Sequence, residues 1–244
     1  MSQSPPLTAL PDLGRQLANA GYAVLDADAV LRFSDNSAEQ VRAWLPHWND
    51  LPPDRYLKDG GRYRRRRHGS FVIDGEQVQH APQRAHWQPV SYNALHGGIE
   101  RWFEPLPAAL VGDPAWARLL RAMARAASAL RGASTWYAEA HSFRIDTTDG
   151  IGRPTPEGAH RDGVDLVAVM LMARVGIKGA ETRVFDAHGP QGVRFTLTQP
   201  FSMLLLDDES VVHESTPIQP LDAAQAAYRD TLVLTLRRGG FQDP

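Results

Sequence analysis

The second half of the sequence is a series of short apolar and β-branched segments separated by glycine, proline and aspartate turns. Such a series is typical of antiparallel strands. The segments that we predict to be strands are 135–145, 165–174, 182–186, 193–198, 202–206, 210–214 and 229–237. No helix-length periodic segment interrupts them except a brief one at 222–227. Short strands at this spacing over about a hundred residues favour an antiparallel sandwich or barrel.

The first half of the sequence predicts mainly helices. The clearest is 114–131, where apolar residues recur at three- and four-residue spacing and arginines lie off that stripe. Shorter helices are predicted at 10–20 and 41–47, and a strand at 22–25. Prolines and an Asp-Gly-Gly turn interrupt regular structure at 50–61. A helical segment followed by a series of strands is typical of an α+β protein.

The long helix needs an apolar surface to cover, which favours one domain over two. We therefore expect a single domain over 1–244, in which a helical and mixed buttress at 1–133 packs against a β core at 134–238. A chain of 244 residues is long enough to bury a sizeable core.

Composition excludes several classes of function. The 26 Lys and Arg are balanced by 28 Asp and Glu, so no overall positive field attracts nucleic acid. The chain has no cysteine, which excludes disulfides, iron–sulfur clusters, thiolate metal sites and cysteine nucleophiles. Any metal must be held by His, Asp or Glu. No segment resembles a secretion signal or a membrane span, which predicts a cytoplasmic protein without a membrane partner.

His160 and Asp162 precede a predicted buried strand, and His213 lies on a later one. Side chains two residues apart on an extended backbone point the same way, so an imidazole and a carboxylate would face one point. Two histidines and one carboxylate on one face of an ion are typical of non-haem Fe(II) oxygenases, whereas zinc more often takes a closed tetrahedron. Taken alone, the first pair is more typical of a solvated turn, and His213 is more typical of a strand histidine bonded to backbone.

Arg229 and Thr231 open the last predicted strand, and period-two alternation places both on one face, opposite a row of leucines. If the leucines pack under the helices, the Arg and Thr face looks into the barrel. A buried guanidinium needs an anion, and a carboxylate is its natural bidentate partner. The alternative is an arginine that reaches solvent at the strand entrance.

The motifs Pro-Glu-Gly-Ala-His-Arg-Asp-Gly at 156–163, Gly-Ala-Glu-Thr at 179–182, His213 and Tyr228-Arg229 resemble those of a known family. This family is the bacterial 2-oxoglutarate and iron dioxygenases of the L-isoleucine dioxygenase type. It includes free L-amino-acid hydroxylases and relatives known by biofilm, stress and motility phenotypes. The resemblance extends over roughly residues 60–238 and is strongest from 139 onward.

The resemblance implies a double-stranded β-helix core, also called a jelly roll or cupin-like fold, with N-terminal helices as a buttress. It implies that His160, Asp162 and His213 are catalytic iron ligands, and that Arg229, assisted by Thr231, binds the distal carboxylate of 2-oxoglutarate. The implied activity is an Fe(II)-, 2-oxoglutarate- and O2-dependent hydroxylation of a small molecule, with a free L-amino acid as the expected substrate.

An amino-acid substrate would need an arginine for its carboxylate and an acidic or carbonyl acceptor for its ammonium. The basic run Arg64–Arg67 is one candidate, although we favour its interpretation as a solvated basic strand edge. At most two of its side chains can point inward, because neighbours on a strand alternate. The other candidates for the cavity are Arg144, Glu139, Glu157, Asn93 and His141, of which His141 is more typical of a satisfied core histidine. His188 lies in a predicted hairpin connection and receives no role.

Two other functions remain open from the sequence. A zinc hydrolase using the same His160, Asp162 and His213 would need a general base, for which Glu157 and Glu214 are the adjacent candidates. A binding or sensing protein related to stress or biofilm formation would keep the cavity without turnover. The sequence is also compatible with a homodimer.

Overall fold

The computed structural model describes residues 3–93 and 95–244, and its largest element is a seven-stranded sheet. The strand order in this main sheet is β1-β9-β5-β12-β4-β2-β3, and every neighbouring pair is antiparallel. The strands are β1 (Tyr22–Leu25), β2 (Arg64–Asp74), β3 (Gln77–His80), β4 (Trp136–Asp146), β5 (Leu166–Val175), β9 (Met203–Asp207) and β12 (Tyr228–Arg238). The main sheet therefore draws on residues on both sides of position 134.

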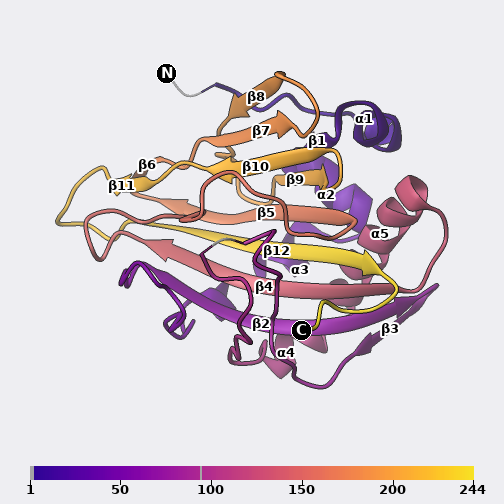
Figure 1. Cartoon of the computed structure of the whole chain (residues 1–244), viewed down its shortest axis with the longest axis horizontal. Coiled ribbons are helices and arrows are strands. Elements are labelled where there is room, and N and C mark those ends of the chain that lie inside the picture. The colour runs from indigo at the N-terminus through magenta and orange to yellow at the C-terminus, as the bar shows by residue number, and fades with distance from the viewer. Residues whose placement is uncertain (1–2, 94) are drawn as a thin grey trace.

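A smaller three-stranded sheet packs against one end of the main sheet, at the top of Figure 1. It consists of β10 (Val211–Ser215), β7 (Thr182–Asp186) and β8 (Gly192–Phe195), and a two-stranded ribbon of β6 (Ile177–Gly179) and β11 (Ile218–Pro220) continues it. Apolar side chains from both sheets form a shared core that includes Val167, Leu204, Val184, Phe195 and Val211. The predicted α+β sandwich with an antiparallel core is confirmed.

The helices bury the opposite face of the main sheet, behind it in the view of Figure 1. Leu232, Leu234 and Leu236 of β12 belong to the same core as Trp116 and Leu120 of the longest helix. The alternate residues of β12 are thereby directed to the inside of the sandwich. The helical elements are η1 (Leu10–Asp12), α1 (Leu13–Ala20), α2 (Ala27–Ser34), α3 (Ala38–Arg42), η2 (Leu45–Trp48), α4 (Ala108–Val111) and α5 (Pro114–Arg131).

Local sequence signals explain where several elements begin and end. The Asp113 side chain accepts a hydrogen bond from the Ala115 amide and caps α5, which begins at Pro114 as predicted. The helix predicted at 41–47 is instead split between α3 and η2, since Pro46 lies at the start of the second element. The brief helix at 222–227 was wrong, because those residues form turns.

None of the described helices has the length and apolar character required to cross a bilayer.

Candidate active site

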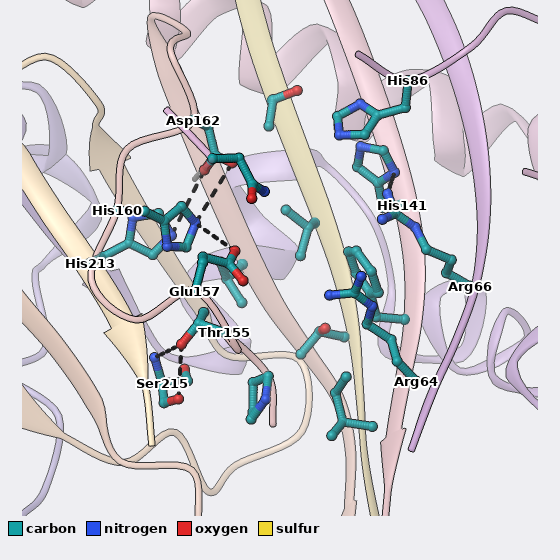
Figure 2. A pocket seen from close by; sticks show the side chains of 18 of the residues that line it. Arg64, Arg66, His86, His141, Thr155, Glu157, His160, Asp162, His213 and Ser215 are labelled. Carbon is teal, nitrogen blue, oxygen red and sulfur yellow. Dashed lines mark hydrogen bonds and ion pairs between the residues drawn. The ribbon is translucent and has the colours of Figure 1, made fainter. Parts of the chain in front are cut away.

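His160 and His213 face each other because their backbones form an isolated antiparallel bridge. The His160 amide donates to the His213 carbonyl at 3.1 Å, the reciprocal bond is 2.9 Å, and the ring centroids are 4.6 Å apart. The carboxylate of Asp162 lies beside both rings, 3.9 Å from Nε2 of His160 and 3.8 Å from Nε2 of His213 (Figure 2). The structure therefore brings together the three side chains that the sequence grouped.

Hydrogen bonds orient two of these three groups. Nδ1 of His160 lies 3.0 Å from the Gly158 carbonyl, which directs Nε2 toward the cluster. The Gln88 amide donates to Oδ1 of Asp162 at 3.1 Å. Nδ1 of His213, by contrast, is buried without a partner among the residues that the structure describes.

Asp208 anchors the loop that carries His160 and Asp162, and the sequence analysis missed it. Its carboxylate accepts backbone N–H bonds from Asp162, Gly163 and Val164 at 3.0, 2.7 and 3.1 Å. Burial, reinforced by the nearby Asp162 charge, raises the pKa of Asp208 to about 7. The only sequence signal was an acidic turn after the predicted strand at 202–206, which by itself is typical of a solvated hairpin.

The three grouped side chains have the chemistry of a metal-binding site. One donor atom from each of His160, Asp162 and His213 lies within 4.8 Å of the others, as ligands of a single ion do. Burial lowers the pKa of His160, but Asp162 and Glu157 outweigh it and the net pKa is raised. Burial and the His160 charge hold the pKa of His213 well below its usual value. Two imidazole nitrogens and one carboxylate oxygen fit a divalent transition metal with open positions.

Arg229 and Thr231 line the same cavity as the His–Asp cluster, on the inner face of β12 as predicted. Arg229 is only 5% exposed and forms no ion pair with any described residue. Burial, then the neighbouring Arg174, lowers the pKa of Arg229 to about 10, so the guanidinium stays charged at neutral pH. A buried cation without a counter-ion is costly, which indicates an anionic ligand.

Residues 45–235 match the family model of the 2OG-Fe dioxygenases. The chain belongs to the 2OG-Fe dioxygenase family. Members use Fe(II), 2-oxoglutarate and O2, and the family implies a small-molecule substrate. Membership favours dioxygenase chemistry over the zinc hydrolase alternative. Of the two general-base candidates for that alternative, Glu214 pairs with Arg183 at 3.1 Å and does not line the cavity, whereas Glu157 lines it.

Solved structures similar to the dioxygenase support the fold. A bsmA homologue from Methylobium petroleophilum PM1 is 52% identical with a TM-score of 0.93, covering 100% of this chain and 99% of that one. IDO from Bacillus thuringiensis is 15% identical with a TM-score of 0.77, covering 98% and 99%. The Fe(II)/α-ketoglutarate-dependent dioxygenase TqaL is 20% identical with a TM-score of 0.71, covering 94% and 87%. The predicted jelly-roll core is thereby confirmed. No curated protein matches the chain.

The wall of the cavity opposite His160 is strongly basic. Arg64 and Arg66 are buried on β2 and line the cavity (Figure 2). Arg65 and Arg67, which alternate with them along the strand, point outward. The prediction of a solvated basic edge was therefore wrong for Arg64 and Arg66, because this part of β2 is not an edge: β4 pairs with it on one side and the segment around Pro52 on the other.

Some of the remaining predicted candidates line the cavity, and others lie away from it. Asn93, His141 and Glu157 line the cavity. Arg144 does not, because its guanidinium binds Asp230 at 2.7 and 2.8 Å on the other face of the sheet. His188 is exposed in the connection between β7 and β8.

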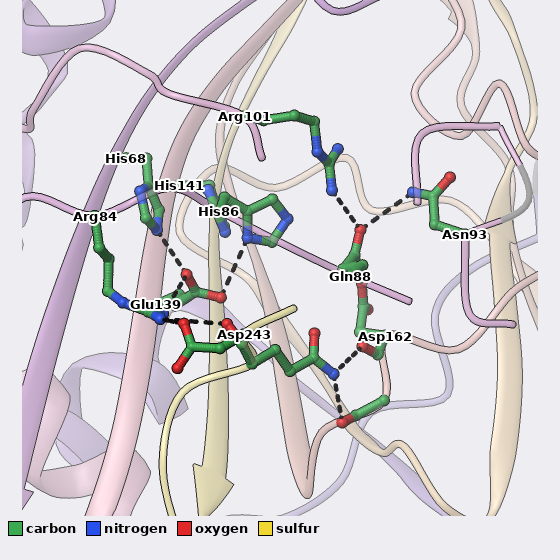
Figure 3. A network of polar contacts seen from close by, with 12 residues as sticks. His68, Arg84, His86, Gln88, Asn93, Arg101, Glu139, His141, Asp162 and Asp243 are labelled. Atoms are coloured by element: carbon green, nitrogen blue, oxygen red, sulfur yellow. Dashed lines mark hydrogen bonds and ion pairs between the residues drawn. The ribbon is translucent and has the colours of Figure 1, made fainter. Parts of the chain in front are cut away.

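Glu139 organises a second group of buried histidines beside the cavity (Figure 3). Its two carboxylate oxygens bind Nε2 of His68 at 2.9 Å and Nδ1 of His86 at 3.1 Å. Arg84 lies 3.8 Å from the same carboxylate. Because a guanidinium already neutralises Glu139, we interpret this group as a charge-balanced support for the cavity wall and not as a second metal site.

The buried histidines around Glu139 should make the stability of the folded protein depend on pH. Burial, only partly opposed by Glu139, lowers the pKa of His86 from 6.5 to about 4, with Arg66 and Arg101 acting in the same direction. Between these two pH values the unfolded chain binds a proton that the folded chain does not, so the His86 contribution is complete above pH 6.5 and is lost as pH falls toward 4. We expect His86 alone to lower the free energy of unfolding by about 2 kcal/mol between pH 7 and 5.

Urea unfolding at both pH values measures this effect. His86→Asn should reduce the pH dependence by that amount, whereas the exposed control His188→Asn should retain it. An unchanged pH dependence in His86→Asn would contradict the assignment.

Proposed function

We propose that His160, Asp162 and His213 hold Fe(II), and that Arg229 with Thr231 binds the distal carboxylate of 2-oxoglutarate. The proposal is carried by one observation: the convergent donor cluster and the unpaired, buried guanidinium line a single cavity. The cavity thus contains both the donor groups that a chelated metal requires and the cation that an anionic cosubstrate requires.

When bound, iron and 2-oxoglutarate supply the oxidation of an unactivated C–H bond to an alcohol by O2, with release of succinate and CO2. The residues of this chain orient the bound groups and shield the reacting atoms from water. Phe143, Ile145, Val169 and Val233 line the cavity between its polar groups and limit the access of water. The backbone bridge fixes His160 and His213 relative to each other, and the Asp208 carboxylate holds the loop that carries Asp162.

We further propose that the hydroxylated substrate is a free L-amino acid. Glu157 lines the cavity beside His160, and its Oε2 is buried without a hydrogen-bond partner among the described residues, as an acceptor for an ammonium group would be before substrate binds. The basic wall opposite supplies donors for a carboxylate. An α-amino acid presents these two charges side by side.

Incubation with Fe(II), 2-oxoglutarate and ascorbate in air tests this function. We expect succinate formation to rise on addition of the twenty L-amino acids, and one of them to gain the mass of one oxygen atom in mass spectrometry. An anaerobic sample serves as the control. Absence of succinate above this control, in protein that binds iron, would favour the non-catalytic binding or sensing function.

A further inference from the structure

Arg101 is a buried cation that the proposed iron and 2-oxoglutarate sites do not use. It lines the same cavity and is 2% exposed. Its Nη2 donates to Oε1 of Gln88 at 2.8 Å, and its Nε is buried without a partner (Figure 3). No carboxylate among residues 3–93 and 95–244 forms an ion pair with it. Like Arg229, it has the properties of an anion-binding group without its anion.

Two further buried guanidinium groups lie on the same wall and share one carboxylate. Asp54 accepts from Nε of Arg64 at 2.7 Å and lies 3.8 Å from Nη1 of Arg66. Nη2 of Arg64 and Nε of Arg66 are buried and have no hydrogen-bond partner among the described residues. Burial, followed by repulsion from Arg64, lowers the pKa of Arg101 to about 10. This wall therefore keeps an excess of positive charge.

The charges near this wall can be matched one by one. Asp54 neutralises one of Arg64 and Arg66, so one positive charge remains there and a second remains at Arg101. Glu139 lies 3.8 Å from Arg84, which also pairs with Asp243; because Asp243 is 67% exposed and its charge is screened by solvent, the buried Glu139–Arg84 pair adds little to the balance. Among the described residues, Glu157 is the one lining carboxylate outside the proposed iron ligands; its Oε1 lies 3.6 Å from Nε2 of His160, and its Oε2 is buried without a partner. Two unneutralised cations and one carboxylate with an unpartnered oxygen are complementary to a molecule with two carboxylates and one ammonium.

We propose that Arg101 binds a carboxylate of the primary substrate, and that this substrate is a dicarboxylic L-amino acid whose second carboxylate binds at Arg64 and Arg66. The inference rests on the proposed function and names the substrate class for the same cavity. Gln88 links Arg101 to Asp162, so a carboxylate held by Arg101 lies one side chain away from a proposed iron ligand. Substrate held there is next to the reacting centre.

Titration calorimetry without oxygen, in the presence of Fe(II) and saturating 2-oxoglutarate, tests the substrate class. Saturation keeps an acidic amino acid from occupying the Arg229 end. We compare L-aspartate with L-asparagine and L-glutamate with L-glutamine, which differ mainly in one charge. We expect one acid to bind roughly 10- to 100-fold more tightly than its amide, as charged hydrogen bonds in a buried site imply. Equal binding of acid and amide, or tighter binding of the amide, overturns the inference.

The same samples separate failure of this inference from failure of the proposed function. The visible charge-transfer band of an Fe(II)–2-oxoglutarate complex reports the metal and cosubstrate sites independently of the substrate. If the band forms and acids have no advantage, only the substrate class is wrong. If the band does not form, the proposed function itself fails.

Substitution of Arg101 distinguishes ligand binding from a structural role. Arg101→Gln should weaken binding of the preferred acid roughly 10- to 100-fold, Arg101→Lys should weaken it less, and the exposed control Arg125→Gln on α5 should leave it unchanged. Because the substitution removes an unpaired buried charge, the melting temperature of substrate-free Arg101→Gln should stay the same or rise. A lower melting temperature with unchanged affinity for the acid would assign Arg101 a structural role and overturn the proposal.

Discussion

His213→Ala is expected to abolish both iron binding and succinate formation. The loss of one of three proposed ligands should weaken iron binding by more than the roughly 10- to 100-fold that loss of a supporting partner typically costs. Activity should fall to that of a sample without protein, because the metal supplies the chemistry. The exposed His188→Ala variant is the matched control and should retain both properties.

The effect of His213→Ala can be separated from damage to the fold. Nδ1 of His213 has no hydrogen-bond partner among the described residues, and no side-chain hydrogen bond is lost with the ring. The backbone bridge to His160 does not depend on the side chain. We therefore expect a melting temperature in metal-free protein close to that of His188→Ala. If the variant binds iron as tightly as His188→Ala does, His213 is not a ligand.

The sequence predicted the parts of the site that follow from strand periodicity. Alternation along 229–237 correctly separated Arg229 and Thr231 from the leucines that pack under α5. The spacing of His160 and Asp162 likewise implied a common direction, which the structure has. In each case the inference needs only the backbone period of an extended chain, which local sequence determines.

The opposite wall of the cavity could not be predicted in the same way. Arg64 and Arg66 lie in a run of four arginines that opens the strand, so alternation there carried no apolar signal, and β2 was not predicted. Arg101 and Gln88 come from a segment with little regular structure. Their position depends on long-range contacts such as the backbone bridge between His86 and Arg101. Sequence spacing does not encode such long-range contacts.

Arg229→Gln should specifically weaken the binding of 2-oxoglutarate. Loss of one partner of a buried ion pair costs on the order of 3–5 kcal/mol, which corresponds to a roughly 10²- to 5 × 10³-fold higher 2-oxoglutarate requirement. Arg229→Lys keeps the charge but not the bidentate geometry and should give an intermediate value. The concentration dependence of succinate formation and of the charge-transfer band measures this requirement, with the exposed Arg194→Gln on β8 as control.

The stability of cosubstrate-free protein provides an independent readout for Arg229. In the folded chain its guanidinium lies buried opposite Arg174 on the neighbouring strand, and no described carboxylate pairs with it. Removal of that charge should leave the melting temperature unchanged or raise it when 2-oxoglutarate is absent, while the stabilisation of the wild type by added 2-oxoglutarate should disappear. If Arg229→Gln is stabilised by 2-oxoglutarate as strongly as Arg194→Gln, the cosubstrate carboxylate binds elsewhere in the cavity.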